Sequence, residues 1–133
     1  MINLEQIRAH RAFEKATAVA EQNYHEEFLS LAQNLPAMFQ NNGLLATWAF
    51  LLSKKGEGAK GAAQQEILET LLTHFRDSQF DLGVANSDVV RVFVEEWTVG
   101  ATSLDGIKLM KLTAEAVAFS GWLKRAAESL CDK

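Results

Sequence analysis

The most apolar stretch of the chain is Leu44–Leu52, in which Thr47 is the only polar residue. An apolar helix of this kind has to be covered on nearly all sides, and it is far too short for a membrane span, which takes about 20 apolar residues. A turn signal, Asn-Asn-Gly, precedes the stretch at residues 41–43, and a helix stop, Lys-Lys-Gly, follows it at residues 54–56. We therefore predict that Leu44–Leu52 forms a buried central helix around which the other elements pack.

The part of the chain before this stretch has helical periodicity from residue 4 to residue 35. Asn3 is the expected N-cap, and Gln6, three residues on, is its expected capping-box partner. The pattern fits one long helix bent near Asn23 or two helices in tandem. Pro36, the only proline, is predicted to occupy the first turn of a short helix that Gly43 ends with a positive φ.

Three elements are predicted between the central helix and the last helix. Ala62–Phe75 has the apolar spacing of an amphipathic helix, and Asp77–Ser87 is rich in turn formers and predicts a loop. Val89–Val94 is ambiguous, because its β-branched residues favour a strand whereas the apolar spacing and the start at Asp88 favour a helix. We predict a helix, since a lone strand would have no partner elsewhere in the chain. Gly100–Ser103 is predicted to be a break.

The last predicted helix, Leu104–Leu130, carries apolar residues at alternating spacings of three and four, which is typical of a coiled-coil seam. The seam consists of Leu109, Leu112, Ala116, Phe119, Leu123, Ala126 and Leu130. The apolar face is widened by Ile107, Met110, Ala114, Val117, Ala118 and Gly121. A face this wide can pack on two neighbours, either two helices of its own domain or one helix and another subunit.

The length of 133 residues suits a single domain over residues 1–133, which is large enough to bury its own core. The elements together predict an all-α, compact bundle of about five to seven helices around the central helix and the long last helix. The single cysteine, Cys131, cannot form an internal disulfide, and the N-terminus is polar and periodic, unlike a signal peptide. We therefore expect a cytoplasmic protein.

The formal net charge of −4 argues against a free-standing nucleic-acid binder held by its overall field. Positive charge is nevertheless gathered in local clusters. In the first of these, Arg8, Arg11 and Lys15 stand at spacings that place all three on one helical face. They form either a solvated face paired with Glu5 and Glu14 or a stripe that contacts phosphates.

Residues Gly56–Gly61 match the G-x-G-x-x-G spacing of dinucleotide-binding loops, and Asp81 lies 20 residues beyond Gly61. That function needs a strand running into the first glycine and a repeated βαβ pattern, and the sequence predicts neither. A Walker A loop does not fit either, because Ala62 and Ala63 follow Gly61 in place of Lys and Ser or Thr. We predict a surface loop here.

Signatures of catalysis are missing from the sequence. The three histidines lie far apart, and the sequence contains no zinc-protease, di-iron or serine-nucleophile motif. We therefore predict no catalytic residue, no metal ligand and no cofactor. The three tryptophans are expected to anchor the core. Trp122 also neighbours Lys124 and Arg125, and aromatic and basic side chains together can stack on and neutralise a single nucleic-acid strand.

Three blocks of the chain resemble one known family. Asn3–Glu14 resembles its opening helix, Leu35–Lys54 its central signature and Ala114–Glu128 its final helix, and the blocks occur in the family's order. The central block, with Leu-Pro followed by Gln-Asn-Asn-Gly, is the most specific of the three. On these residues the chain is similar to the small helical subunit of the type III-B CRISPR effector, the Cmr complex.

The resemblance implies a compact all-α structural protein without catalytic activity, metal or cofactor. In this family, copies stack head to tail, line the groove that holds the guide RNA paired with its target, and bridge to the large polymerase-like subunit. The expected partners are therefore other CRISPR effector subunits, copies of the chain itself and the guide–target duplex, but not a membrane. The residues implied to contact RNA are Arg8, Arg11, Lys15, Lys54, Lys55, Lys124 and Arg125.

Other interpretations stay open beside this one. Arg8 and Arg125 could pair with glutamates at a helix or subunit interface rather than with phosphates. The chain could also be a helical adaptor that binds only protein and self-associates through the Leu109–Leu130 seam, without RNA contact. A small enzyme or nucleotide binder that uses Gly56–Gly61 is the remaining alternative.

Overall fold

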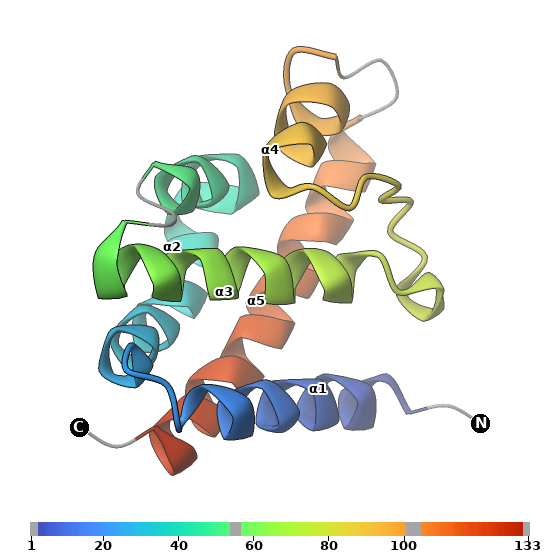
Figure 1. Ribbon diagram of the computed structural model, residues 1–133. Coiled ribbons are helices and arrows are strands. Elements are labelled where there is room, and N and C mark those ends of the chain that lie inside the picture. The colour runs from blue at the N-terminus through green and yellow to red at the C-terminus, as the bar shows by residue number, and fades with distance from the viewer. Residues whose placement is uncertain (1–2, 54–56, 101–104, 132–133) are drawn as a thin grey trace.

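The computed structural model describes residues 3–53, 57–100 and 105–131, and all regular structure in these residues is helical (Figure 1). The elements in chain order are α1 (Leu4–Val19), α2 (His25–Leu52), α3 (Gly58–Phe75), the 3-10 helix η1 (Ser78–Phe80), α4 (Val89–Arg91), the π-helix η2 (Val92–Trp97) and α5 (Gly106–Leu130). Helix α5 packs against α1 and α2, and α3 packs against α2. The predicted all-α bundle is confirmed.

Helix α1 begins where its cap was expected. The Asn3 side-chain oxygen accepts hydrogen bonds from the backbone N–H groups of Glu5 and Gln6, at 2.9 and 3.3 Å. The helix ends at Val19, and α2 begins only at His25. Of the two arrangements that the pattern allowed for residues 4–35, the tandem pair of helices is therefore the one adopted.

Helix α2 contains both Pro36 and Gly43 and corrects one prediction. Pro36 does not start a short helix but lies in the interior of α2. Its missing N–H leaves a gap in the helical hydrogen bonds, yet the buried residues Leu35 and Phe39 on either side of it hold the segment against the core. Gly43 has φ 81° and ψ 175°, so it does end the first straight segment of α2, as predicted.

The second segment of α2 forms the predicted central helix, with one difference in its burial. Leu44, Trp48 and Leu51 are almost completely buried, and the Trp48 ring lies against the rings of Trp97 and Phe75, with centroids 5.0 and 6.1 Å away. The Trp48 indole N–H donates to the carbonyl oxygen of Val89 at 2.9 Å. Phe50, however, is 44% exposed, so the expectation of cover on nearly all sides is wrong. Neighbouring helices bury only one side of this segment.

Helix α3 begins at Gly58, four residues earlier than Ala62, and this overturns the predicted surface loop for its described part. Gly61 and Ala63 are buried in the first turns of α3. Side chains this small suit the close approach of a neighbouring helix, whereas Gly58 is exposed and has a positive φ of 65°. Gly56 lies outside the described residues.

The segment Val89–Trp97 is helical rather than extended, as predicted. The Asp88 carboxylate accepts hydrogen bonds from the N–H groups of Val90 and Arg91, both at 2.9 Å, and so caps α4. Helix α4 continues into the wider π-helix η2. At Gly100 the chain passes so close to η2 that an added Cβ would lie 2.7 Å from the carbonyl oxygen of Glu95. The rest of the predicted break, residues 101–103, lies outside the described residues.

Helix α5 confirms the middle of the predicted seam, whereas its end residues differ: Leu109 is half-buried and Leu130 is 39% exposed. Leu112, Ala116, Phe119, Leu123 and Ala126 are fully buried, against helices of the same chain. The first turns of α5 lack such cover, since the exposed fractions of Ile107 and Met110 are 70% and 72%. The wide apolar face of α5 therefore has two parts. The buried seam residues pack against helices of the same chain, and the apolar residues of the first turns are exposed.

Candidate nucleic-acid interface

The three basic residues of α1 lie on one face, as predicted, but this face meets other helices. Arg8 donates from Nε and Nη2 to the two carboxylate oxygens of Glu115 on α5, with both distances 2.7 Å. Such a two-point pairing is the strongest geometry available to a guanidinium and a carboxylate. Arg8 therefore joins α1 to α5, which agrees with the alternative that it pairs with a glutamate at a helix interface.

Arg11 and Lys15 also have acidic partners from distant parts of the chain. Arg11 donates to Asp77 Oδ2 at 2.9 Å and to His74 Nδ1 at 2.8 Å. Lys15 Nζ lies 2.5 Å from Glu66 Oε1 on α3. The partners in this stripe are thus not Glu5 and Glu14, as a solvated face would require. The cationic side chains of α1 instead connect it to α3 and α5.

His74 is the fully buried centre of this arrangement. Because Arg11 can only donate, His74 Nδ1 is the acceptor, and the proton sits on Nε2, which donates to Glu115 Oε2 at 2.8 Å. The His74 ring stacks on Phe119, with centroids 3.9 Å apart and an interplanar angle of 5°. Burial lowers the pKa of His74, and the opposing attraction of Glu115 does not outweigh it. His74 is therefore neutral in the folded protein near pH 7.

Glu115 stays ionised although it is buried. Burial alone would raise the pKa of Glu115, but the hydrogen bonds from Arg8 and His74 lower it below its usual range. The hydrogen bond to Glu115 in turn raises the pKa of Arg8. We refer to Arg8, Arg11, His74, Asp77 and Glu115 as the internal ion network. Its hydrogen bonds and ion pairs connect α1 to α5 and to the C-terminal end of α3, so its role is structural.

The second basic cluster, Lys124 and Arg125 on α5, is arranged differently. Arg125 is exposed, and its guanidinium carbon lies 5.7 Å from the centre of the Trp122 ring. Trp122 is half-buried and packs against the core, as expected of an anchor, while also supporting Arg125. Within residues 3–53, 57–100 and 105–131, neither Lys124 nor Arg125 has a carboxylate partner. This cluster can therefore meet an external anion.

Lys54 and Lys55 lie outside the described residues. Lys60, which follows them on α3, is exposed and lies beside a groove on the outer side of α2. The structure thus separates the predicted RNA-contacting residues into an α1 set held by internal ion pairs and an α5 set that faces outward.

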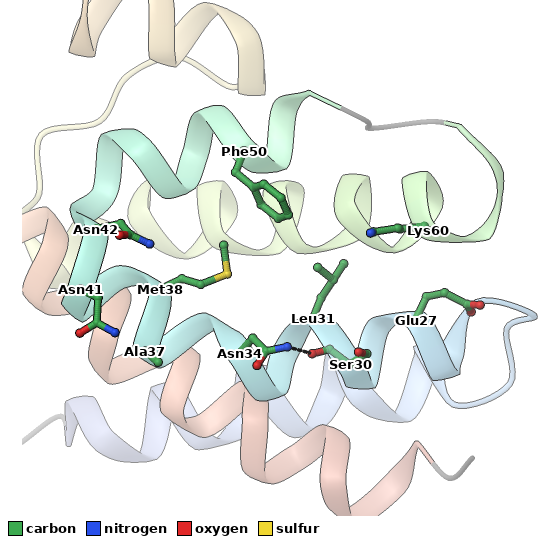
Figure 2. A pocket seen from close by; sticks show the side chains of 10 residues that line it. All are labelled: Glu27, Ser30, Leu31, Asn34, Ala37, Met38, Asn41, Asn42, Phe50 and Lys60. Carbon is green, nitrogen blue, oxygen red and sulfur yellow. Dashed lines mark hydrogen bonds between the residues drawn. The ribbon is translucent and has the colours of Figure 1, made fainter.

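The groove beside Lys60 has a volume of about 520 Å³ and was not identified from the sequence. We call it the α2 groove; its floor is the outer face of the first segment of α2, from Glu27 to Asn41, and its opposite wall contains Phe50 and Lys60. Figure 2 shows Leu31 and Met38 pointing across the groove toward Phe50. The spacing of Leu31, Asn34, Met38 and Asn41 on one helical face is the signal that could have revealed it.

Two other kinds of site are absent from the described part of the chain. It contains no group of three or more His, Cys, Asp or Glu residues that could hold a metal ion. None of its helices is long and apolar enough to cross a membrane.

Comparison with known proteins agrees with the architecture. The family model described as "CRISPR-associated protein (Cas_Cmr5)" matches residues 4–130. Among solved structures, the chain is similar to a crystal structure of a CRISPR-associated Cmr5 family protein from Thermus thermophilus. The two are 24% identical, and the match covers 98% of this chain and 100% of the other with a TM-score of 0.73, which establishes a shared fold. No curated protein matches the chain.

Proposed function

We propose that this chain, which belongs to the Cmr5 family of CRISPR-associated proteins, is a non-catalytic structural subunit of a type III-B effector. In this proposal, copies of the chain stack head to tail and line the groove that holds the guide RNA and its target. The family match over residues 4–130 is the observation that carries this proposal. We further propose that the whole chain acts as one domain in the cytoplasm. Its partners would be the large polymerase-like subunit, other effector subunits and further copies of itself.

We assign the RNA contacts first to Lys124 and Arg125. Their charges have no acidic partner in the described structure, and they project from α5, whose other side is fixed by the buried seam. A rigid cation can neutralise a phosphate without reading a base, which suits a complex whose sequence specificity comes from pairing with the guide. The Arg125–Trp122 contact also holds the guanidinium in a fixed orientation. Lys54 and Lys55 remain in this assignment on the basis of the sequence.

Arg8, Arg11 and Lys15 are given a different role within the same proposal. Their hydrogen bonds to Glu115, Asp77 and Glu66 occupy donors that a phosphate would need. RNA contact by this stripe would require those buried or half-buried carboxylates to lose their partners, which is costly. We therefore propose that the α1 set braces the subunit on which the α5 set is presented.

The test is a charge reversal in the assembled complex. Lys124→Glu and Arg125→Glu should each weaken binding of target RNA and reduce the dependence of log Kobs on log salt by roughly 0.7–0.9 per lost phosphate contact. Arg91→Glu is the matched control, because Arg91 is an exposed arginine whose only ion pair is the i,i+4 contact with Glu95 at 3.9 Å among the described residues. Unchanged affinity and slope in both α5 variants would contradict the assignment.

The structure gives less support to the other interpretations. The Leu112–Ala126 part of the seam is covered by α1 and α2 of the same chain, so an adaptor could not self-associate through this part without opening the core. The nucleotide-binding alternative needs a loop after a strand, whereas Gly58–Phe75 is a helix. Any self-association must therefore use a surface other than this part of the seam.

A further inference from the structure

We infer that the α2 groove of one copy receives the first two to three turns of α5 from the next copy in the stack. This inference rests on the proposed function and specifies which two surfaces meet. Each surface is uncovered within the chain itself.

The α2 groove has a length and a lining that suit a bound helix. Glu27 and Asn41 stand 14 positions apart on one face of α2, so the floor of the groove extends over about 20 Å at 1.5 Å per residue. Its apolar part is formed by Leu31, Met38 and the exposed ring of Phe50. A long hydrophobic strip with polar margins is how proteins receive one face of an amphipathic helix.

The start of α5 is a helix with an uncovered apolar face. Ile107, Met110 and Ala114 are all exposed and stand at i, i+3 and i+7, so they lie on one side. The Asp105 carboxylate accepts a hydrogen bond from the N–H of Lys108 at 2.8 Å and caps this first turn. Because the helix is already formed, docking it does not require a disordered segment to fold.

The two surfaces lie on different sides of the molecule, which is the requirement for a head-to-tail contact. In Figure 1 the beginning of α5 lies beside α4 toward the upper right, whereas the beginning of α3, which carries Lys60 of the groove wall, lies at the far left. A contact between two different patches is heterologous, and it repeats along an open array unless the rotation closes a ring. Each copy would then use both of its uncovered surfaces.

Charge favours a protein occupant of this groove over RNA. Among the described residues, the ionisable side chains that line the groove are Glu27 and Lys60, so this described lining lacks the positive charge that a nucleic-acid strand requires. The inserted helix carries Lys111 one position after Met110, and Lys111 is exposed and without an ion pair among the described residues. Lys111 of one copy then stays at the polar rim of the next copy's groove while the apolar residues meet inside.

The experiment is a cysteine cross-link in the assembled complex. A chain that carries both Met38→Cys and Met110→Cys is incorporated, treated with a mild oxidant such as diamide, and examined by denaturing electrophoresis without reductant. Both positions are accessible, whereas the native Cys131 is buried. We expect a ladder of dimers and longer oligomers, and no ladder from either single variant. The pair Met38→Cys/Val90→Cys is the control, because Val90 is also exposed but lies on α4.

A charge-swap variant gives a second readout that does not depend on the oxidant. Met38→Asp and Met110→Lys should each reduce the number of copies per complex in native mass spectrometry, and combining them in one chain should restore it. A complex that contains guide RNA and several copies but gives no ladder would overturn this inference while leaving the proposed function intact. Photo-cross-links from the RNA to the groove would overturn it as well. Absence of the chain from any guide-RNA complex would instead contradict the proposed function.

Discussion

Arg8 and Glu115 are joined by two hydrogen bonds of 2.7 Å although they are 107 positions apart in the chain. The pair fastens the first helix to the last, and Glu115 also accepts from the buried His74. The side chain of Glu115 is only 8% exposed, so its charge depends on these partners rather than on water. The internal ion network should therefore contribute to stability in a way that mutation can measure.

We expect Glu115→Gln to lower the free energy of unfolding by about 3 kcal/mol, because it leaves the Arg8 guanidinium without its counter-charge in a half-buried site. Urea denaturation at pH 7 measures the change. Glu14→Gln is the control, because among the described residues Glu14 forms only an exposed i,i+4 contact with His10 at 3.9 Å. Equal midpoints for the two variants would show that the network is not a stabilising brace.

The pH dependence of the free energy of unfolding should show that His74 is neutral in the folded protein. Its pKa is lowered by burial in the folded protein, whereas in the unfolded chain it has its ordinary value of 6.5. Below pH 6.5 the unfolded state therefore binds more protons than the folded state, and stability falls as the pH drops. Glu115, whose folded pKa lies below its ordinary 4.5, adds a further loss at more acidic pH.

His74→Gln tests this dependence, because glutamine keeps a hydrogen-bond donor for Glu115 but does not titrate. The variant should be less stable at pH 7, and its free energy of unfolding should change less than that of the wild type between pH 7 and pH 5. Chemical denaturation at the two pH values gives the comparison. His25→Gln is the matched control, because the only hydrogen bond of the His25 ring to the described residues goes to the backbone carbonyl of Gln22, and this variant should keep the wild-type pH dependence. Parallel pH profiles for the wild type and His74→Gln would contradict the buried neutral state of His74.

Gly43 should resist substitution for a conformational reason. Its φ of 81° and ψ of 175° belong to a region that is essentially open only to glycine, while an added Cβ would meet no atom within 4 Å. We expect Gly43→Ala to cost about 1–3 kcal/mol, all of it from backbone strain. Gly106→Ala serves as the control in thermal melts, because Gly106 starts α5 with helical geometry and also has open space around it. A Tm as high for Gly43→Ala as for Gly106→Ala would rule out the strain.

Trp48 should be needed for its N–H as well as for its size. Trp48→Phe removes the hydrogen bond to the carbonyl oxygen of Val89, which costs about 0.5–1.5 kcal/mol before any cavity is counted. Trp122→Phe makes the matched comparison, because the Trp122 ring is half-buried. Urea titration of both variants should show the larger loss at Trp48. A larger loss of stability for Trp122→Phe than for Trp48→Phe would mean that the hydrogen bond from α2 to α4 contributes little to stability.

Much of the helical framework could be predicted from the sequence because its signals are local. Asn3 and Asp88 act as caps over two or three residues, and the buried seam of α5 follows a spacing of three and four. Pro36 was misjudged because its local signal, a helix start, is overridden by the burial of Leu35 and Phe39 around it. The α2 groove was missed because its walls come from two segments of α2 and from α3.

The sequence by itself determined where helices form and to which family the chain is similar, since both depend on residues close together in the chain. Only the tertiary structure decided which charges are available. The spacing of Arg8, Arg11 and Lys15 shows a common face but not what covers that face. The partners Glu115, Asp77 and Glu66 come from distant segments, and their positions are fixed by helix packing. The α1 cations are therefore half-buried in ion pairs between helices, whereas Lys124 and Arg125 have no such partner among the described residues.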